Sequence, residues 1–136
     1  MKSYTDIEQS KKLAEILPLE SADMTYRPMM DIDSMSNSGF LDTPECFPFN
    51  DFKNSIIKPL PCWSLAALLI VLPNNEHITT SVSRGSWQIE PINYLPITWW
   101  CEYEDNESLT EFNVTADNPV DACYEMILKL NELKVL

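Results

Sequence analysis

Glycine and histidine are almost missing from this chain of 136 residues, which holds two glycines and one histidine. A glycine-rich loop that cradles phosphate needs several glycines close together, whereas Gly39 and Gly85 lie far apart. The sequence therefore predicts no nucleotide cofactor. A catalytic arrangement built on histidine would have to use His77. Because His77 ends the polar stretch Pro73-Asn74-Asn75-Glu76-His77, we expect an exposed loop residue there.

Basic residues are also scarce: 9 lysines and arginines stand against 21 aspartates and glutamates, which gives a net charge of −12. No basic residue lies between Arg84 and Lys129. The acidic residues of that stretch are Glu90, Glu102, Glu104, Asp105, Glu107, Glu111, Asp117, Asp121 and Glu125. Proteins that bind nucleic acid need clustered basic side chains to displace the counterions of the phosphates. We therefore expect no direct binding of nucleic acid.

Close pairs of cysteines are absent as well. Cys46, Cys62, Cys101 and Cys123 lie 16, 39 and 22 positions apart, unlike the closely spaced ligands of zinc and redox sites. We expect no metal site and free, mostly buried thiols, with disulfides as the alternative.

A long apolar run and a secretory leader are missing too. The longest apolar run, Leu65 to Leu72, has eight residues, and a membrane span needs about 20. The first residues, Met1 to Lys12, include charges but no apolar core of a signal peptide. These features predict a cytoplasmic protein without membrane contact. The length and the apolar fraction of 45% predict one domain over residues 1–136.

Capping signals predict helices near both ends of the chain. Thr5 to Glu8 matches a capping box, so the first helix should begin there and end at Pro18. The last helix should open with Asn118 as its cap and Pro119 as its first residue. It should bury one stripe of side chains: Val120, Cys123, Ile127 and Leu130.

The middle of the chain has weaker signals. Residues 25–61 contain many turn formers and prolines, which predicts a long loop or insertion within the domain. The phenylalanines of this segment are too apolar for a free linker, so parts of it should pack on the domain or on a partner. After Pro61, the alanines and leucines of Trp63 to Leu72 favour a helix, with a buried strand as the alternative.

From Ile78 to Val114, apolar and polar residues alternate as they do in an antiparallel meander. The expected parts are strands over 78–83, 87–91, 99–104 and 109–114, a turn at 84–85 and a hairpin tip at 104–107. The sequence thus predicts an α+β fold with a meander of three or four strands. We expect the N-terminal, central and C-terminal helices to pack on one face of that sheet.

The hairpin carries the candidate site. Its acidic residues are Glu102, Glu104, Asp105, Glu107 and Glu111. They could form a solvated surface, a surface that binds a partner, or ligands for a hard cation. Trp99 and Trp100 are adjacent in a predicted strand and so point to opposite faces. The ring that leaves the core, or is covered by residues 25–61, marks a possible partner site.

Three segments, Lys12 to Pro18, Pro61 to Leu69 and Ala116 to Leu130, cover about a quarter of the chain. They resemble an uncharacterised family of small acidic proteins from gut anaerobic bacteria, their prophages and mobile elements. The resemblance implies a bacterial or phage setting in the cytosol. It implies no activity, cofactor or catalytic residue.

Our leading hypothesis is a non-enzymatic cytosolic domain that binds another protein. A basic partner protein would suit the negative charge of this chain. Such a domain could serve as an accessory protein of a phage or mobile element. The second is an acidic nucleic-acid mimic that blocks a host or defence protein, as the stretch without basic residues suggests. The third is a small enzyme that uses carboxylates, although no nucleophile, base and orienting group can be named together.

Overall fold

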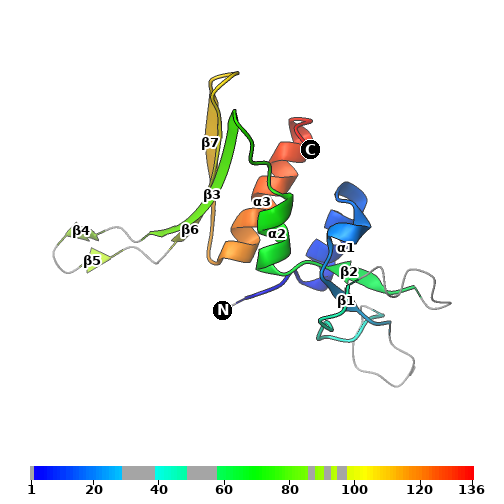
Figure 1. Cartoon of the computed structure of the whole chain (residues 1–136). Coiled ribbons are helices and arrows are strands. Elements are labelled where there is room, and N and C mark those ends of the chain that lie inside the picture. The colour runs from blue at the N-terminus through cyan, green and yellow to red at the C-terminus, as the bar shows by residue number, and fades with distance from the viewer. Residues whose placement is uncertain (1, 29–38, 49–57, 86–87, 91–92, 95–97) are drawn as a thin grey trace. The chain divides into compact units, whose positions relative to one another are not determined.

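The computed structural model describes residues 2–28, 39–48, 58–85, 88–90, 93–94 and 98–136 (Figure 1). The chain divides into two compact units: the N-terminal unit is Tyr4–Ala67, and the sheet unit is Leu68–Leu136 with Met1–Ser3. The expectation of one domain over residues 1–136 stays a prediction. None of the helices in the described residues is long and apolar enough to cross a membrane.

The N-terminal unit begins with helix α1, Ile7–Ile16, followed by the short 3-10 helix η1, Leu19–Ser21. The cap of α1 is Asp6, not Thr5 as predicted, because the Asp6 carboxylate accepts the backbone N–H of Gln9 at 2.8 Å. The Gln9 side chain in turn accepts the N–H of Asp6, which completes a capping box one residue later than expected.

Thr5 has a different role, as the centre of a buried hydrogen-bond network. Its hydroxyl pairs with the Ser10 hydroxyl at 2.8 Å and accepts the Trp63 N–H at 3.2 Å. Its carbonyl accepts the Tyr26 hydroxyl at 2.9 Å and the Cys62 thiol at 3.4 Å. A polar group that has lost its water must find such partners, and this requirement moves the cap to the exposed Asp6.

The predicted loop over 25–61 begins and ends in strands. Strand β1, Met24–Tyr26, pairs in antiparallel fashion with β2, Leu60–Cys62. Phe40 packs against a small core of Tyr26, Leu60 and Cys62, as expected for part of this segment. Phe49 and Phe52, which were part of the same expectation, lie outside the described residues.

Pro61, which was expected near the start of a helix, lies inside β2 opposite Thr25, four residues before α2 begins. Helix α2, Leu65–Val71, begins after Ser64, whose hydroxyl accepts the Ala67 N–H at 3.2 Å. The expected helix is therefore confirmed, but it is shorter at both ends than the predicted span of 63–72.

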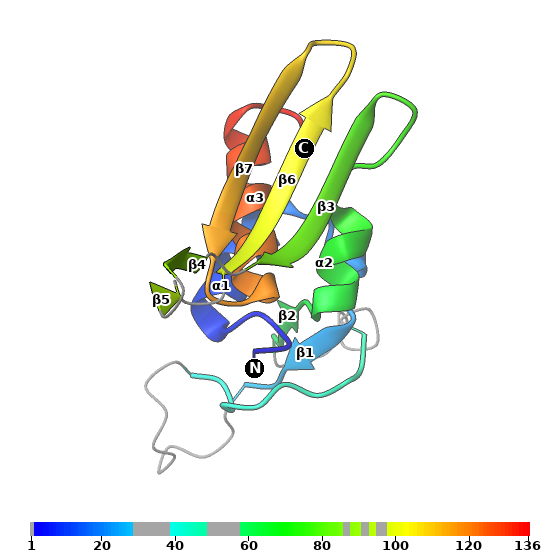
Figure 2. The same ribbon diagram turned by 90° about the vertical axis from the view of Figure 1, so that its left-hand side faces the viewer.

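Three antiparallel strands in the order β3-β6-β7 form the main sheet of the sheet unit (Figure 2). They are β3, Ile78–Gly85; β6, Thr98–Asp105; and β7, Thr110–Ala116. A separate two-stranded sheet joins β4, Gln88–Glu90, to β5, Asn93–Tyr94. The α+β fold with antiparallel sheets is thus confirmed, while Trp87 and Pro91 of the predicted second strand lie outside the described residues.

The predicted turn at Arg84-Gly85 is wrong, because β3 continues through both residues. All eight residues of β3 pair with the eight of β6, and Arg84 lies opposite Trp99. The regular ladder with β6 satisfies backbone groups that a turn would leave to water, and so overrides the local preference of glycine for turns.

Helix α3, Pro119–Glu132, packs on the sheet. Asn118 caps it by accepting the Asp121 N–H at 2.9 Å, and Pro119 is its first residue, as predicted. The predicted stripe of Val120, Cys123, Ile127 and Leu130 is fully buried. The expectation that the other two helices share this face of the sheet stays a prediction.

Candidate interaction surface

The register of the sheet separates the residues of β6 into two faces. Cys101 and Tyr103 are buried on the face that α3 covers. The even-numbered residues of β6 therefore lie on the opposite face of the sheet. Trp99 shares the helix-covered face and Trp100 lies on the other, and both rings are partly exposed. The prediction that the two tryptophans point to opposite faces is confirmed by this register.

We call the uncovered side the open face. It includes Thr79, Ser81 and Ser83 of β3, Trp100, Glu102 and Glu104 of β6, and Glu111, Asn113 and Thr115 of β7. All are exposed except Trp100 and Glu102, which are partly exposed. Every charged group on this surface is a carboxylate. The open face therefore presents one partly exposed aromatic ring among hydroxyl, amide and carboxylate groups.

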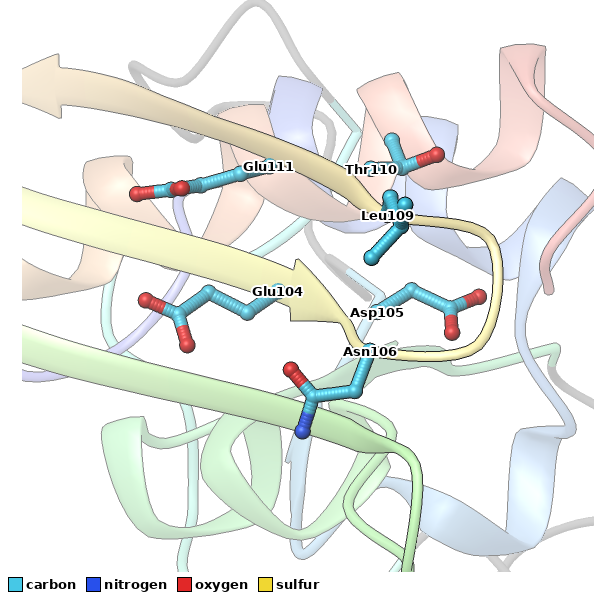
Figure 3. A pocket seen from close by; sticks show the side chains of 6 residues that line it. All are labelled: Glu104, Asp105, Asn106, Leu109, Thr110 and Glu111. Atoms are coloured by element: carbon cyan, nitrogen blue, oxygen red, sulfur yellow. The ribbon is translucent and has the colours of Figure 1, made fainter.

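Two of these carboxylates are direct neighbours across the strands. Glu104 of β6 lies opposite Glu111 of β7, and Glu102 lies opposite Asn113 in the next row of the open face. Opposed residues have Cβ atoms about 5 Å apart, and like charges in such a pair destabilise the sheet. Figure 3 shows both side chains extending the same way, away from the hairpin turn. The fold thus concentrates negative charge where nothing within the open face neutralises it.

Asp105 and Glu107 belong to the turn instead. The Asp105 carboxylate accepts the backbone N–H groups of Glu107 at 3.0 Å and Ser108 at 3.3 Å. Partial desolvation alone would raise the pKa of Asp105, but the hydrogen bonds from Ser108 and Glu107 outweigh it and lower that pKa below its ordinary value. Asp105 therefore shapes the turn, and its carboxylate is engaged by backbone N–H groups there.

A small hollow beside the turn has a volume of about 190 Å³ (Figure 3). Its lining residues are Glu104, Asp105, Asn106, Leu109, Thr110 and Glu111. Pockets for small molecules are larger, about 300 to 1,000 Å³, and mostly apolar. This hollow is therefore a poor fit for an organic substrate. Among the described residues, no group of three histidine, cysteine or acidic side chains could hold a metal ion.

The other chemically reactive residues among those described are not part of the open face. His77 is exposed in the loop before β3, as predicted. All four cysteines are free, and three of them are buried, which confirms the expectation for the thiols. Burial raises the pKa of Cys62 to about 11, so its thiol stays protonated and unreactive near neutral pH.

The sequence predicts the acidic residues and Trp100 of the open face as candidate residues, but not its hydroxyl and amide residues. Thr79, Ser81, Ser83, Asn113 and Thr115 share the open face with the acidic residues. Their signal was the alternation within each predicted strand. What the alternation could not supply is the pairing of the strands, which decides that Glu111 opposes Glu104.

Comparisons of this chain with protein-family models, with curated proteins and with solved structures find no match. The resemblance of three segments to a family from gut anaerobes and their mobile elements therefore stays a prediction.

Proposed function

We propose that this chain is a non-enzymatic module that binds a basic partner protein through the open face. The observation that carries the proposal is the pair Glu104 and Glu111, which are like charges held opposite each other in the sheet. Such a pair costs stability in the free protein. Departures of this kind from what stability favours are typical of functional sites. A lysine or arginine from a partner would relieve the repulsion and add charge-assisted hydrogen bonds.

The partly exposed Trp100 supports the same proposal. Tryptophan is enriched among the residues that contribute most to binding between proteins. Trp100 lies two positions before Glu102 on the open face, next to the hydroxyl residues Ser83 and Thr115 on the flanking strands. An apolar ring with a polar, acidic surround matches the usual arrangement of an apolar anchor and a polar rim.

A variant that replaces Glu102, Glu104 and Glu111 with glutamine tests the proposal. In pull-downs from the source cells, it should lose the proteins that the original chain retains, and the original should lose them as salt rises. The control replaces Glu20, Glu125 and Glu132, which are also exposed acidic residues, with glutamine and changes the net charge equally. Recovery of the same proteins by all three chains would contradict the proposal.

The nucleic-acid mimic is the second candidate, and one observation favours it. The carboxylates of Glu102, Glu104 and Glu111 lie in adjacent rows on one face, as a regular array of negative charge would require. The two candidate functions predict different effects on nucleic acid that the partner protein itself binds. If a captured partner releases DNA or RNA when this protein binds, and the glutamine variant fails to cause release, the mimic is favoured. If the nucleic acid stays bound, the chain is a binding module without mimicry.

A further inference from the structure

The two outer edges of the main sheet differ in how their backbone groups are satisfied. In an antiparallel pair, residues alternate between those whose N–H and C=O face the partner strand and those whose groups face away. Hydrogen bonds to the loop before β3 fix this alternation. Thr80 donates its N–H to the Asn74 side chain at 2.9 Å. Ile78 exchanges two bonds of 2.9 Å with Asn75. The even-numbered residues of β3 therefore face away from β6.

The register then assigns every backbone group in β6 and β7. Because Tyr103 pairs with the outward-facing Thr80, its N–H and C=O point to β7, where they meet Phe112. Residues of β7 that alternate with Phe112 must face away from the sheet. They are Glu111, Asn113 and Thr115, and we call their backbone N–H and C=O groups the β7 edge.

These outward groups form no hydrogen bond within the part of the chain that the structure describes, in contrast with the first half of the β3 edge, which Asn74 and Asn75 occupy. Natural edge strands are usually blocked by charged side chains, above all lysine, by proline or by a bulge. Strand β7 contains no lysine or proline, its one charged side chain is that of Glu111, and its register with β6 is regular over seven residues. Figure 2 shows β7 at the margin of the sheet. The β7 edge is therefore available for pairing with another strand.

The side chains around this edge indicate what a pairing strand would carry. A strand added to β7 places alternate side chains on the two faces of the sheet. Those opposite Glu111, Asn113 and Thr115 would lie on the open face, beside the carboxylates of Glu104 and Glu111. Those opposite Phe112 and Val114 would meet partly exposed apolar side chains on the other face. Charge and polarity thus favour basic residues at one set of positions and apolar residues at the other.

We infer that the β7 edge binds an extended protein segment in which basic and apolar residues alternate, by adding it to the sheet as a fourth, antiparallel strand. This inference rests on the proposed function and specifies its partner. Main-chain hydrogen bonds to Glu111, Asn113 and Thr115 supply affinity, while the carboxylates of the open face select basic side chains. Pairing by the main chain distinguishes this mode from attraction by charge alone.

The test uses a nine-residue peptide that alternates lysine and valine, with its binding measured by fluorescence anisotropy at low salt. Methylation of the lysine amide nitrogens removes the hydrogens that face β7 but keeps every charge. It should weaken binding about tenfold or more. Methylation of the valine amides, which face away, is the matched control and should leave the affinity unchanged. Both arms use the unaltered protein.

A protein variant provides the reciprocal test. Asn113→Pro removes one outward N–H without breaking a bond to β6, and should weaken the peptide about tenfold. Arg84→Pro makes the same change at an outward position of the β3 edge and should have little effect. Circular dichroism shows whether both variants fold. If Asn113→Pro does not fold, the methylated peptides still test whether the β7 edge adds a strand.

The outcomes separate this inference from the proposed function. If all peptides bind equally but the glutamine variant of Glu102, Glu104 and Glu111 does not bind, the open face attracts basic partners by charge, and the strand-addition inference is wrong. If neither methylation nor the glutamine substitutions alter binding, or if no peptide binds at low salt, both the inference and the basic-partner proposal fail.

Discussion

Ile127 is the residue whose loss should show most directly how α3 and the sheet depend on each other. Its side chain is 0% exposed, within the stripe that α3 lays on the sheet. Ile127→Ala removes three carbons, and at about 0.8 kcal/mol for each buried CH₂ this forfeits about 2.4 kcal/mol. The cavity adds up to about 2 kcal/mol where the surroundings do not collapse. We expect the free energy of unfolding to fall by about 3 to 4 kcal/mol.

Ile70 offers a matched control, because its side chain on α2 is 82% exposed. Ile70→Ala makes the same chemical change and should alter the free energy of unfolding by less than about 0.5 kcal/mol. Urea denaturation followed by circular dichroism measures both values, and a thermal scan should show a decrease of about 10 to 15 °C for Ile127→Ala. Equal effects of the two substitutions would refute the packing of α3 on the sheet.

Four further predictions concern charge, capping and the thiols. Glu111→Gln should raise the free energy of unfolding by about 0.2 to 1 kcal/mol by removing the charge opposite Glu104; a gain that persists in about 1 M salt would contradict this cause. Asp6→Ala should lower that free energy by about 0.5 to 2 kcal/mol through loss of the α1 cap, with a matching loss of helical circular dichroism. In the folded protein, iodoacetamide should label exposed Cys46 and spare buried Cys62, as mass spectrometry can determine. Burial raises the pKa of Cys62 from 9.0 to about 11, so the folded state holds the thiol proton more tightly than the unfolded state does. The contribution of Cys62 to the free energy of unfolding should therefore be complete below pH 9 and disappear as pH rises to 11. An unchanged urea midpoint over that range would contradict the burial of this thiol.

The parts of the fold that could be predicted depend on signals within a few residues. Asn118 and Pro119 open α3 as expected, because a cap acts through bonds to the following turn. The missed cap at Asp6 has a distant cause. Thr5 accepts the N–H of Trp63, 58 positions away, and no local pattern contains that partner. Local chemistry allowed either residue to cap α1, and burial decided between them.

The candidate site likewise has a part that local sequence signals predict and a part that depends on distant pairing. Alternation along β6 and β7 correctly placed Phe112 with Val114 on one face and Glu111 with Asn113 on the other. It could not show that Glu111 lies opposite Glu104, because that pairing depends on where the turn falls. The turn covers Asn106 to Leu109, later than the predicted tip, and the Asp105 carboxylate accepts the backbone N–H of Glu107 within it.

The two faces of the main sheet have separate roles although the same strands form both. On the covered face, Cys101 and Tyr103 are buried, and the Tyr103 ring stacks on Phe112 with centroids 4.9 Å apart. Burial of these groups beneath α3 stabilises the unit without using any residue of the open face. A strand with a period of two residues thus lets the repulsion of Glu104 and Glu111 coexist with a stable fold. Substitutions on the open face should therefore change binding far more than they change folding, whereas substitutions beneath α3 should do the reverse.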